Sequence, residues 1–177
     1  VYFAADDGVH GRELWRADGT SAGAALVKDI REEGGSNPQY LTVFNGALYF
    51  ACDDGAHGVE LWRSDGTDAG TVMVTDLNPA TGSYAQNFCV FGGALYFSAN
   101  EGTTDRELWR TDGTEAGTVL VKDVFPGGHA SPQFLTEAGG LLYFSAAAPD
   151  SGQELWCTDG TSAGTALVKD IRAGGNA

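Results

Sequence analysis

Short apolar runs alternate with polar turn segments along the whole chain. Within residues 37–83 the runs are YLTVF, ALYFAC, VELWRS and TVMVTDL, each five to seven residues long. They are rich in β-branched and aromatic residues, which favour strands. An amphipathic helix would instead place apolar residues three and four positions apart over about ten or more residues, and no run does so. The pattern therefore predicts an all-β protein.

The same pattern occurs four times with a fixed spacing of 47 residues. The run that begins Glu-Leu-Trp recurs without any insertion, at Glu13, Glu60, Glu107 and Glu154. A fixed period of about 20 to 50 residues is typical of solenoids, propellers and other repeat arrays. We expect four equivalent units, which cover residues 1–36, 37–83, 84–130 and 131–177.

The segments between the runs predict how the strands connect. The first two runs of a unit, which we call strands A and B, are joined in the second unit by Asn45-Gly46, a dipeptide suited to a two-residue hairpin turn. Strands C and D are joined by DGTxAG, whose aspartate should accept backbone N–H bonds within its own turn. These aspartates are Asp18, Asp65, Asp112 and Asp159. Each unit is predicted to be a four-stranded antiparallel meander, and the first unit lacks strand A.

Adjacent apolar residues within a strand indicate that both faces of each sheet are covered. Leu108 and Trp109 are neighbours and therefore point to opposite faces, whereas a sheet with one solvated face would alternate apolar and polar residues. Four such sheets can cover one another around an axis, as the blades of a β-propeller do. We expect one propeller domain, or an arc of a larger ring. Four tryptophans should pack between blades: Trp15, Trp62, Trp109 and Trp156.

Charge and composition exclude some partners. The chain has 24 acidic and 10 basic residues, a formal net charge of −14, and binding to a phosphate backbone needs clustered Lys and Arg. We therefore expect no nucleic-acid partner, and no membrane span because no run of about 18 apolar residues occurs. The three cysteines, Cys52, Cys89 and Cys157, lack zinc-site spacing, and a pairing of Cys52 with Cys89 across a blade interface stays open.

The repeated motif resembles a known family. Glu-Leu-Trp-x-x-Asp-Gly-Thr-x-x-Gly-Thr followed by Val-Lys-Asp is similar to the ELWxxDGT repeat, with Ala24 and Thr75 as small departures. More distantly, the unit is similar to YWTD-type and TolB-type blades. The resemblance implies a propeller-like fold in large secreted or surface-attached proteins, mostly from bacteria. It implies no known enzymatic activity.

Polar residues that differ between units are concentrated in the B–C and D–A loops. In a meander these loops lie at one end, opposite the tight A–B and C–D turns. Loops on a rigid scaffold commonly carry binding function. We expect a binding rim that contains Asp6, Asp7, His10, Asp53, Asp54, His57, Glu101, Asp105 and His129.

Calcium is the one candidate cofactor. Ca²⁺ prefers clustered carboxylates and carbonyls, and the candidate ligands are Asp6, Asp7, Asp53 and Asp54. The pattern D-x-[DN]-x-[DN]-G is absent, however, and DDG also suits an ordinary hairpin loop. We expect no cofactor, with calcium as the alternative.

No pattern supports nucleophilic catalysis. The chain has no GxSxG and no convincing Cys–His pair. The glutamate that begins each Glu-Leu-Trp run recurs in every unit, whereas a catalytic carboxylate is needed once. We therefore expect it to be structural and to pair with the arginine three residues later, which is Arg16, Arg63 or Arg110.

These inferences predict a non-enzymatic repeat module of a secreted or cell-surface protein. It would act as a scaffold, or bind a protein or a glycan through the loop rim. One alternative is a propeller hydrolase or lyase with an axial site. The other is an assembly module whose first unit is completed by a strand from another molecule, by strand addition.

Overall fold

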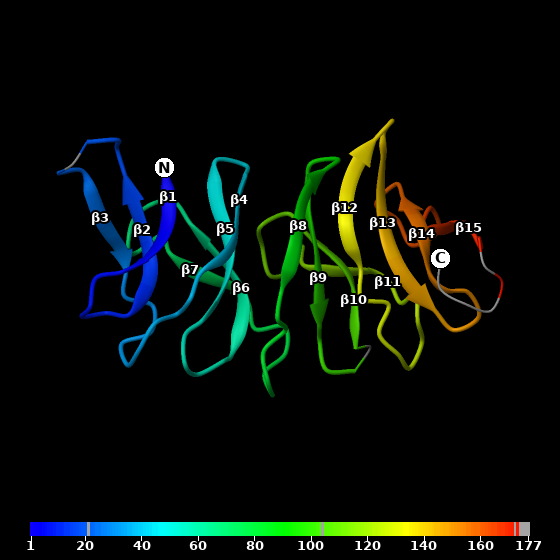
Figure 1. Ribbon diagram of the computed structural model, residues 1–177, viewed down its shortest axis with the longest axis horizontal. Coiled ribbons are helices and arrows are strands. Elements are labelled where there is room, and N and C mark those ends of the chain that lie inside the picture. The colour runs from blue at the N-terminus through cyan, green and yellow to red at the C-terminus, as the bar shows by residue number, and fades with distance from the viewer. Residues whose placement is uncertain (21, 104, 172, 174–177) are drawn as a thin grey trace. The chain divides into compact units, whose positions relative to one another are not determined.

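The computed structural model describes residues 1–20, 22–103, 105–171 and 173, and in this part of the chain the regular structure consists of strands alone. Within these described residues, fifteen strands form four antiparallel sheets, and each strand of a sheet pairs with its neighbours in sequence (Figure 1). The prediction of an all-β fold built from meandering four-stranded blades is therefore confirmed, including a first sheet of three strands.

The strand bounds follow the 47-residue repeat. The first sheet contains β1 (Tyr2–Asp6), β2 (Arg12–Ala17) and β3 (Ala24–Lys28). The second contains β4 (Gln39–Phe44), β5 (Ala47–Asp53), β6 (Val59–Ser64) and β7 (Val72–Thr75). The third contains β8 (Gln86–Phe91), β9 (Ala94–Asn100), β10 (Arg106–Thr111) and β11 (Val119–Lys122). The fourth contains β12 (Gln133–Ala138), β13 (Leu141–Ala148), β14 (Gly152–Thr158) and β15 (Ala166–Lys169).

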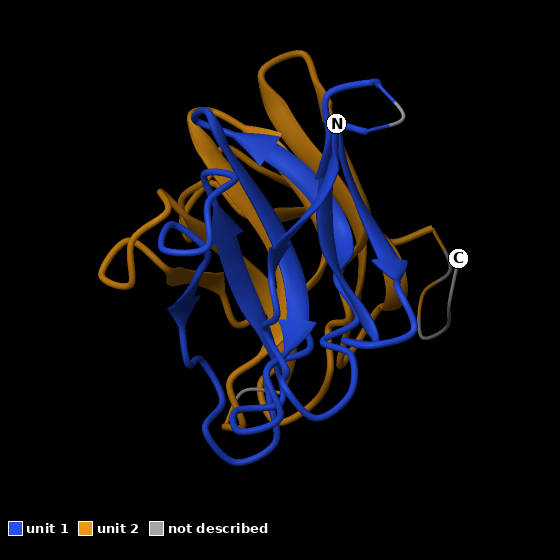
Figure 2. Ribbon diagram, turned by 90° about the vertical axis from the view of Figure 1, so that its left-hand side faces the viewer, with its two compact units in different colours: residues 1–84 blue, residues 85–177 orange. Residues whose placement is uncertain are grey.

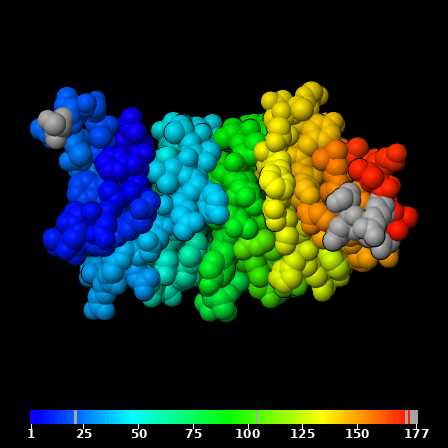
Figure 3. All heavy atoms as spheres, in the orientation of Figure 1, coloured from blue at the N-terminus to red at the C-terminus, as the bar shows by residue number. Residues whose placement is uncertain are grey.

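The sheets are grouped into two compact units. Unit 1 is Val1–Tyr84 and holds the first two sheets, and unit 2 is Ala85–Ala177 and holds the other two (Figure 2). In the space-filling view, the blue and cyan atoms of unit 1 lie against each other, as do the green and yellow atoms of unit 2 (Figure 3). We call each sheet with its loops a blade and number the blades 1 to 4 along the chain.

The tight turns have the backbone geometry that their sequences favour. Asn45 and Gly46 between β4 and β5 have φ angles of 48° and 78°, so both residues of this hairpin turn have positive φ. In the C–D turn of blade 2, Asp65 Oδ1 accepts hydrogen bonds from the Thr67 backbone N–H and hydroxyl. Gly70 lies so close to the Asp65 carboxylate that any Cβ there would collide with it. This contact explains the second glycine of DGTxAG.

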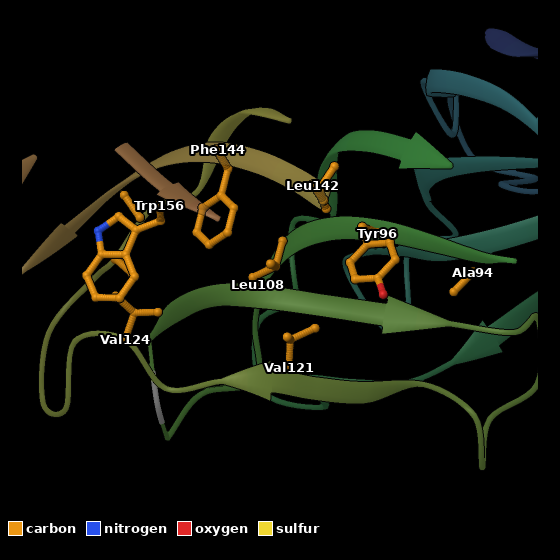
Figure 4. Close-up of a cluster of buried hydrophobic side chains, with 10 residues drawn as sticks. Ala94, Tyr96, Leu108, Val121, Val124, Leu142, Phe144 and Trp156 are labelled. Carbon is orange, nitrogen blue, oxygen red and sulfur yellow. The ribbon is translucent and has the colours of Figure 1, made fainter. Parts of the chain in front are cut away.

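A hydrophobic core joins the two sheets of each unit. In unit 1, Leu14 and Val27 of blade 1 pack with Phe50 and Trp62 of blade 2. In unit 2, Leu108 and Val124 of blade 3 pack with Phe144 and Trp156 of blade 4, and Figure 4 shows Trp156 beside Val124. Burying a tryptophan contributes at most about 4–6 kcal/mol, so these cores hold the blades together.

The tryptophans differ in burial. Trp62, Trp109 and Trp156 are 7%, 5% and 8% exposed, whereas Trp15 on blade 1 is half-buried. Strand β1 pairs with β2, and its residues Tyr2 to Ala5 are also half-buried, although their equivalents Tyr49 to Cys52 on β5 are buried. Blade 1 is therefore less protected from solvent than blade 2.

Close contacts also join the two blades of each unit at the C–D turns. In unit 1 the Tyr2 hydroxyl lies against Gly66 of the next blade, and in unit 2 the Tyr96 hydroxyl lies against Gly160 in the same way. A Cβ at either glycine would collide with the hydroxyl. The glycine of DGT is thus required both by its positive φ and by the tyrosine of the preceding blade.

Candidate functional site: the loop rim

The recurring glutamate anchors the D–A loop of its own blade. Glu13, Glu60 and Glu107 are fully buried, and Glu154 is 2% exposed. The pairing that we expected with the arginine three residues later is wrong: in blades 1 to 3 the glutamate side chains turn inward and bind loop backbone. Residues three apart in a strand face opposite sides of the sheet, so the glutamate points into the core while the arginine points outward.

In Glu60, both carboxylate oxygens accept hydrogen bonds from the D–A loop. Its Oε1 accepts the backbone N–H groups of Asn78 and Ser83 at 3.0 and 2.8 Å, and its Oε2 accepts the Ser83 hydroxyl at 2.5 Å. Burial raises the pKa of Glu60, and the four hydrogen-bond donors around it oppose that shift. Glu13 is held in the same way by Ser36, through its N–H at 2.8 Å and its hydroxyl.

Glu107 has the same place but lacks the hydroxyl, because Ala130 stands where blades 1 and 2 have serine. Its carboxylate accepts the backbone N–H groups of Val124, Phe125 and Ala130 at 3.0, 3.3 and 3.4 Å. Burial, with a smaller contribution from the charge of Asp123, raises the pKa of Glu107 to about 7. The structural carboxylate of blade 3 therefore titrates near neutral pH.

The B–C loops of blades 1 and 2 each hold an Asp–His pair. Asp54 Oδ1 accepts the backbone N–H groups of Ala56 and His57, and its Oδ2 lies 2.7 Å from His57 Nδ1. Burial acts to raise the pKa of Asp54, but the hydrogen bonds from His57 outweigh it and lower the pKa. The bond to Asp54 raises the pKa of His57.

Asp7 and His10 repeat this arrangement in blade 1, with 2.7 Å between Oδ2 and Nδ1. Hydrogen bonds from the His10 backbone, the His10 ring and the Val9 backbone lower the pKa of Asp7 to about 2. The bond to Asp7 raises the pKa of His10. In both loops the aspartate therefore serves to fold the loop and to orient the imidazole.

The remaining predicted rim residues also make local contacts. Asp6 Oδ1 accepts the Gly8 N–H at 2.7 Å, and Asp53 Oδ1 accepts the Gly55 N–H at 2.7 Å. In unit 2, Glu101 accepts the Thr103 hydroxyl at 2.7 Å, and His129 Nε2 lies 3.5 Å from Asp105 Oδ1. Each of these rim residues therefore contacts a partner within its own unit.

A hollow opens on the rim of unit 1. It has a volume of about 580 Å³ and lies between the D–A loop of blade 1, residues 28–33, and the B–C loop of blade 2, residues 54–56. Arg31 crosses between these loops, with its Nη1 2.6 Å from Asp53 Oδ2. Lys28, at the other end, is paired with Asp68 at 3.1 Å. Glu32 and Glu33 are exposed, so the hollow has an acidic lining.

The calcium ligands that we considered are not brought together. Among residues 1–20, 22–103, 105–171 and 173, no group of three or more His, Cys, Asp or Glu side chains could hold a metal ion. Asp6, Asp7, Asp53 and Asp54 instead accept N–H groups of their own loops. The three cysteines are free thiols, and burial raises the pKa of Cys52.

A set of residues at the start of strand A has a backbone conformation that was not predicted from the sequence. Tyr40, Asn87 and Phe134 stand at the same position of the repeat and have φ angles of 57°, 61° and 56°. Each lies in an irregular step of the A–B pairing, such as that between Gln133 and Thr136. We call these three the bulge residues. The only sequence signal is a recurring Gln before them, in PQY, AQN and PQF.

The fold places the chain among β-propeller-like proteins. It is similar to a puromycin hydrolase of known structure, with a TM-score of 0.59 and 18% identity over 97% of this chain and 27% of that one. It is also similar to a structure from an analysis of two prolyl endopeptidases, with a TM-score of 0.61 and 13% identity over 94% of this chain and 24% of that one. The chain therefore spans about a quarter of the length of these proteins.

At these identities the similarity shows the fold alone. No protein-family model matches the chain, and no curated protein sequence matches it. The part of the chain that the structure describes contains no helix of the length and apolar character needed to cross a bilayer.

Proposed function

We propose that this chain is a non-enzymatic propeller module that acts as a scaffold and binds a partner through its B–C and D–A loops. The observation that carries the proposal is the use of the recurring carboxylates. Glu13, Glu60 and Glu107 are buried and bind loop backbone, and the aspartates of the DGT turns bind their own turns. The glutamates are therefore withdrawn from solvent, whereas the aspartates are exposed and accept hydrogen bonds within their own turns.

The polar groups that vary between blades are left on the rim. In unit 1, Asp54 lines the hollow between residues 28–33 and 54–56. Both flanking loops are fixed by short bonds, from Arg31 to Asp53 and from His57 to Asp54. A rigid, concave and polar surface of this kind is suited to a specific partner. Resemblance to the ELWxxDGT repeat supports an extracellular or cell-surface location for the module.

The test is binding by the whole chain to arrays of glycans and of extracellular proteins. Arg31→Ala should weaken binding, because it releases the bond that fixes the D–A loop of blade 1 against the B–C loop of blade 2. Arg16→Ala is the matched control, since Arg16 is exposed on the outer side of β2 near the C–D turn. Equal binding by both variants would contradict a role for the hollow.

A hydrolase is the second candidate, because the solved proteins to which the chain is similar are a puromycin hydrolase and a prolyl endopeptidase. The chain would then supply part of a propeller for an active site. Hydrolysis of peptide and ester substrates by the purified chain distinguishes the two. We expect no hydrolysis. Hydrolytic activity that copurifies with the chain would overturn the proposal of a non-enzymatic module.

A third candidate is assembly by strand addition. Strand β1 pairs with β2, and its residues are more exposed than their equivalents on β5, so a strand from a second molecule could cover them. Sedimentation across a concentration series tests this idea. A monomer at every concentration would exclude it.

A further inference from the structure

Blade 4 leaves one apolar face of its sheet open to solvent. Leu155, Val168 and Ile171 are 43%, 47% and 66% exposed, and we call these three residues the blade 4 face. Their equivalents on blade 3 are at most 6% exposed and pack against blade 4 (Figure 4). These equivalents are Leu108, Val121 and Val124. A face that the next blade covers in blade 3 is therefore bare in blade 4.

Blade 1 leaves the opposite face of its sheet open. Phe3 and Trp15 are direct partners across β1 and β2, and both are only half-buried. Val1, next to them on the sheet, is 87% exposed. We call these three residues the blade 1 face. In blade 2 the equivalent pair is Phe50 and Trp62, which are 0% and 7% exposed because blade 1 packs on them.

The two open faces are the two halves of the junction that joins blades within a unit. In unit 1 the first half is Leu14 and Val27 of blade 1, and the second half is Phe50 and Trp62 of blade 2. The same positions of blades 3 and 4 meet in unit 2. The blade 4 face has the residues of the first half, and the blade 1 face has those of the second. The chain therefore presents both halves of one further junction, uncovered.

The tyrosine–glycine contact of the junctions is also missing its partner at these faces. In unit 2 the Tyr96 hydroxyl lies so close to Gly160 that a Cβ there would collide with it. At Gly19, the equivalent glycine of blade 1, a Cβ would meet no atom within 4 Å. The equivalent tyrosine of blade 4 is Tyr143, which is half-buried, whereas Tyr96 is 3% exposed. The space beside Gly19 is therefore open for a tyrosine hydroxyl.

The lysine at the end of strand D follows the same pattern. In unit 2, Lys122 Nζ donates to the Thr165 carbonyl of the next blade at 2.8 Å. In unit 1, Lys28 Nζ donates to the Asp68 carbonyl of the next blade at 3.4 Å. Lys169, the equivalent lysine of blade 4, is exposed beside the blade 4 face. Apolar, tyrosine and lysine groups of a junction are thus all presented by blade 4.

We propose that the blade 4 face binds the blade 1 face of a second copy of this chain. Each copy supplies both halves of the junction, so two copies are complementary without any further component. The contact is head-to-tail, and two copies joined at both ends form a closed ring. That ring has eight blades, twice the four sheets of one chain, which is within the range of about four to eight in propellers.

This inference goes beyond the proposed binding function and does not depend on it. It also differs from assembly by strand addition. Strand addition would use the backbone edge of β1, whereas the junction uses side chains on the faces of two sheets. Residues of blade 4 therefore distinguish the two modes of association.

Analytical ultracentrifugation of the whole chain measures the association. Concentrations up to about 100 μM include the weakest affinities typical of a protein interface of standard size. The mass should approach twice the 18.5 kDa of one chain. Both copies carry a formal charge of −14, so the buffer should contain enough salt to screen their repulsion.

Leu155→Glu is the first variant, because it places a charge in the blade 4 face. It should weaken association by about 100-fold or more, since the junction would bury that charge without a partner. Val90→Glu is the matched control. Val90 is also 43% exposed, lies on β8 away from both faces, and is replaced by Glu137 at the same position of blade 4. It should associate as the parent chain does.

Gly19→Asn is the second variant, because it fills the space beside Gly19 in the blade 1 face. Asparagine tolerates the positive φ of this position, and its side chain meets open space in a single chain. In the junction it would collide with the Tyr143 hydroxyl of the second copy. Association should therefore weaken by about ten-fold or more, the effect of losing one close contact, while circular dichroism shows that the chain is folded.

A mixture of the two variants tests the head-to-tail arrangement. In a ring of one variant alone, both junctions carry a substituted face. In a mixed ring, the blade 4 face of Gly19→Asn meets the blade 1 face of Leu155→Glu, and neither of these faces is substituted. The mixture should therefore associate more tightly than either variant does by itself.

Three results would overturn the inference. They are a monomer at every concentration, association that is unchanged in Leu155→Glu, and a mixture that associates no more tightly than its components. The second result would leave strand addition in place. The proposed binding function fails separately, as no partner on the glycan and protein arrays. If Leu155→Glu did not fold, Gly19→Asn against the parent chain would decide, because unchanged association there would equally overturn the junction.

Discussion

Units 1 and 2 are built from the same repeat, but they satisfy a buried charge differently. In unit 1, Glu60 receives two backbone N–H groups and the hydroxyl of Ser83. In unit 2, Glu107 receives three backbone N–H bonds of 3.0, 3.3 and 3.4 Å, and Ala130 supplies no hydroxyl. The comparison teaches that the fold needs the carboxylate at this position, while one hydroxyl decides how readily that carboxylate takes up a proton.

The largest effect should be common to both units. Trp62→Ala and Trp156→Ala each remove a tryptophan from the core between two blades, and each should lower the free energy of unfolding by about 3–5 kcal/mol. Urea denaturation followed by circular dichroism measures this. Trp15→Ala should cost less, because Trp15 is half-buried. A loss below about 1 kcal/mol at Trp62 or Trp156 would contradict the packing described.

The second effect is a pH dependence of stability that should be larger for Glu107 in unit 2 than for Glu60 in unit 1. The pKa of Glu107 is raised from 4.5 to about 7 in the folded chain. Its contribution to stability is therefore fully present below pH 4.5 and is lost as the pH rises through 7. The loss amounts to on the order of 3 kcal/mol.

Glu107→Gln should remove this dependence, because glutamine stays neutral and can still accept the N–H groups of Phe125 and Ala130. The free energy of unfolding, measured by urea titration from acid to neutral pH, gives the result. Glu60→Gln is the matched variant in unit 1, and it should flatten the pH profile less. Identical pH profiles for the parent chain and Glu107→Gln would refute the assignment.

Removing the hydroxyl beside Glu60, or adding one beside Glu107, should make each carboxylate behave more like the other. Ser83→Ala removes a hydrogen bond to a charged group and should cost about 1–3 kcal/mol near neutral pH. It should also raise the pKa of Glu60 further. Ala130→Ser should have the opposite effect on stability and should lower the pKa of Glu107. NMR titration of the glutamate carboxyl carbon measures both pKa values. A pKa of Glu107 that stays near 7 in Ala130→Ser would show that burial alone sets it.

The smallest effect concerns the Asp–His pairs of unit 1, which are partly exposed to solvent. The ring of His57 should titrate above its ordinary pKa of 6.5, and Asp54→Asn should return it to that value because the bond to Oδ2 is lost. NMR titration of the imidazole signals measures both.

The arrangement of strands could be predicted from the sequence because short-range signals determine it. Asn45-Gly46 specifies a hairpin by its φ angles, and adjacent residues such as Leu108 and Trp109 require cover on both faces of a sheet. A rigid 47-residue period then places equivalent residues in equivalent surroundings. All fifteen strands follow from these rules.

The chemistry of the site could not be predicted in the same way, because it depends on where side chains point across loops. The partner of Glu60 is Ser83, on the far side of a loop that carries no regular pattern. We expected Arg63 instead, although an odd spacing on a strand rules it out. The bulge at Phe134 was missed because positive φ in an aromatic residue has no sequence signature of its own.

The contact between the Tyr96 hydroxyl and Gly160, like that between Tyr2 and Gly66, joins residues separated by more than one repeat length. Both residues recur in all four repeats of the sequence, as Tyr2, Tyr49, Tyr96 and Tyr143 and as Gly19, Gly66, Gly113 and Gly160. Duplication or deletion of whole repeats would leave every junction with its complementary pair, wherever the cut falls. An architecture of this kind can change its number of blades during evolution without a new interface having to arise.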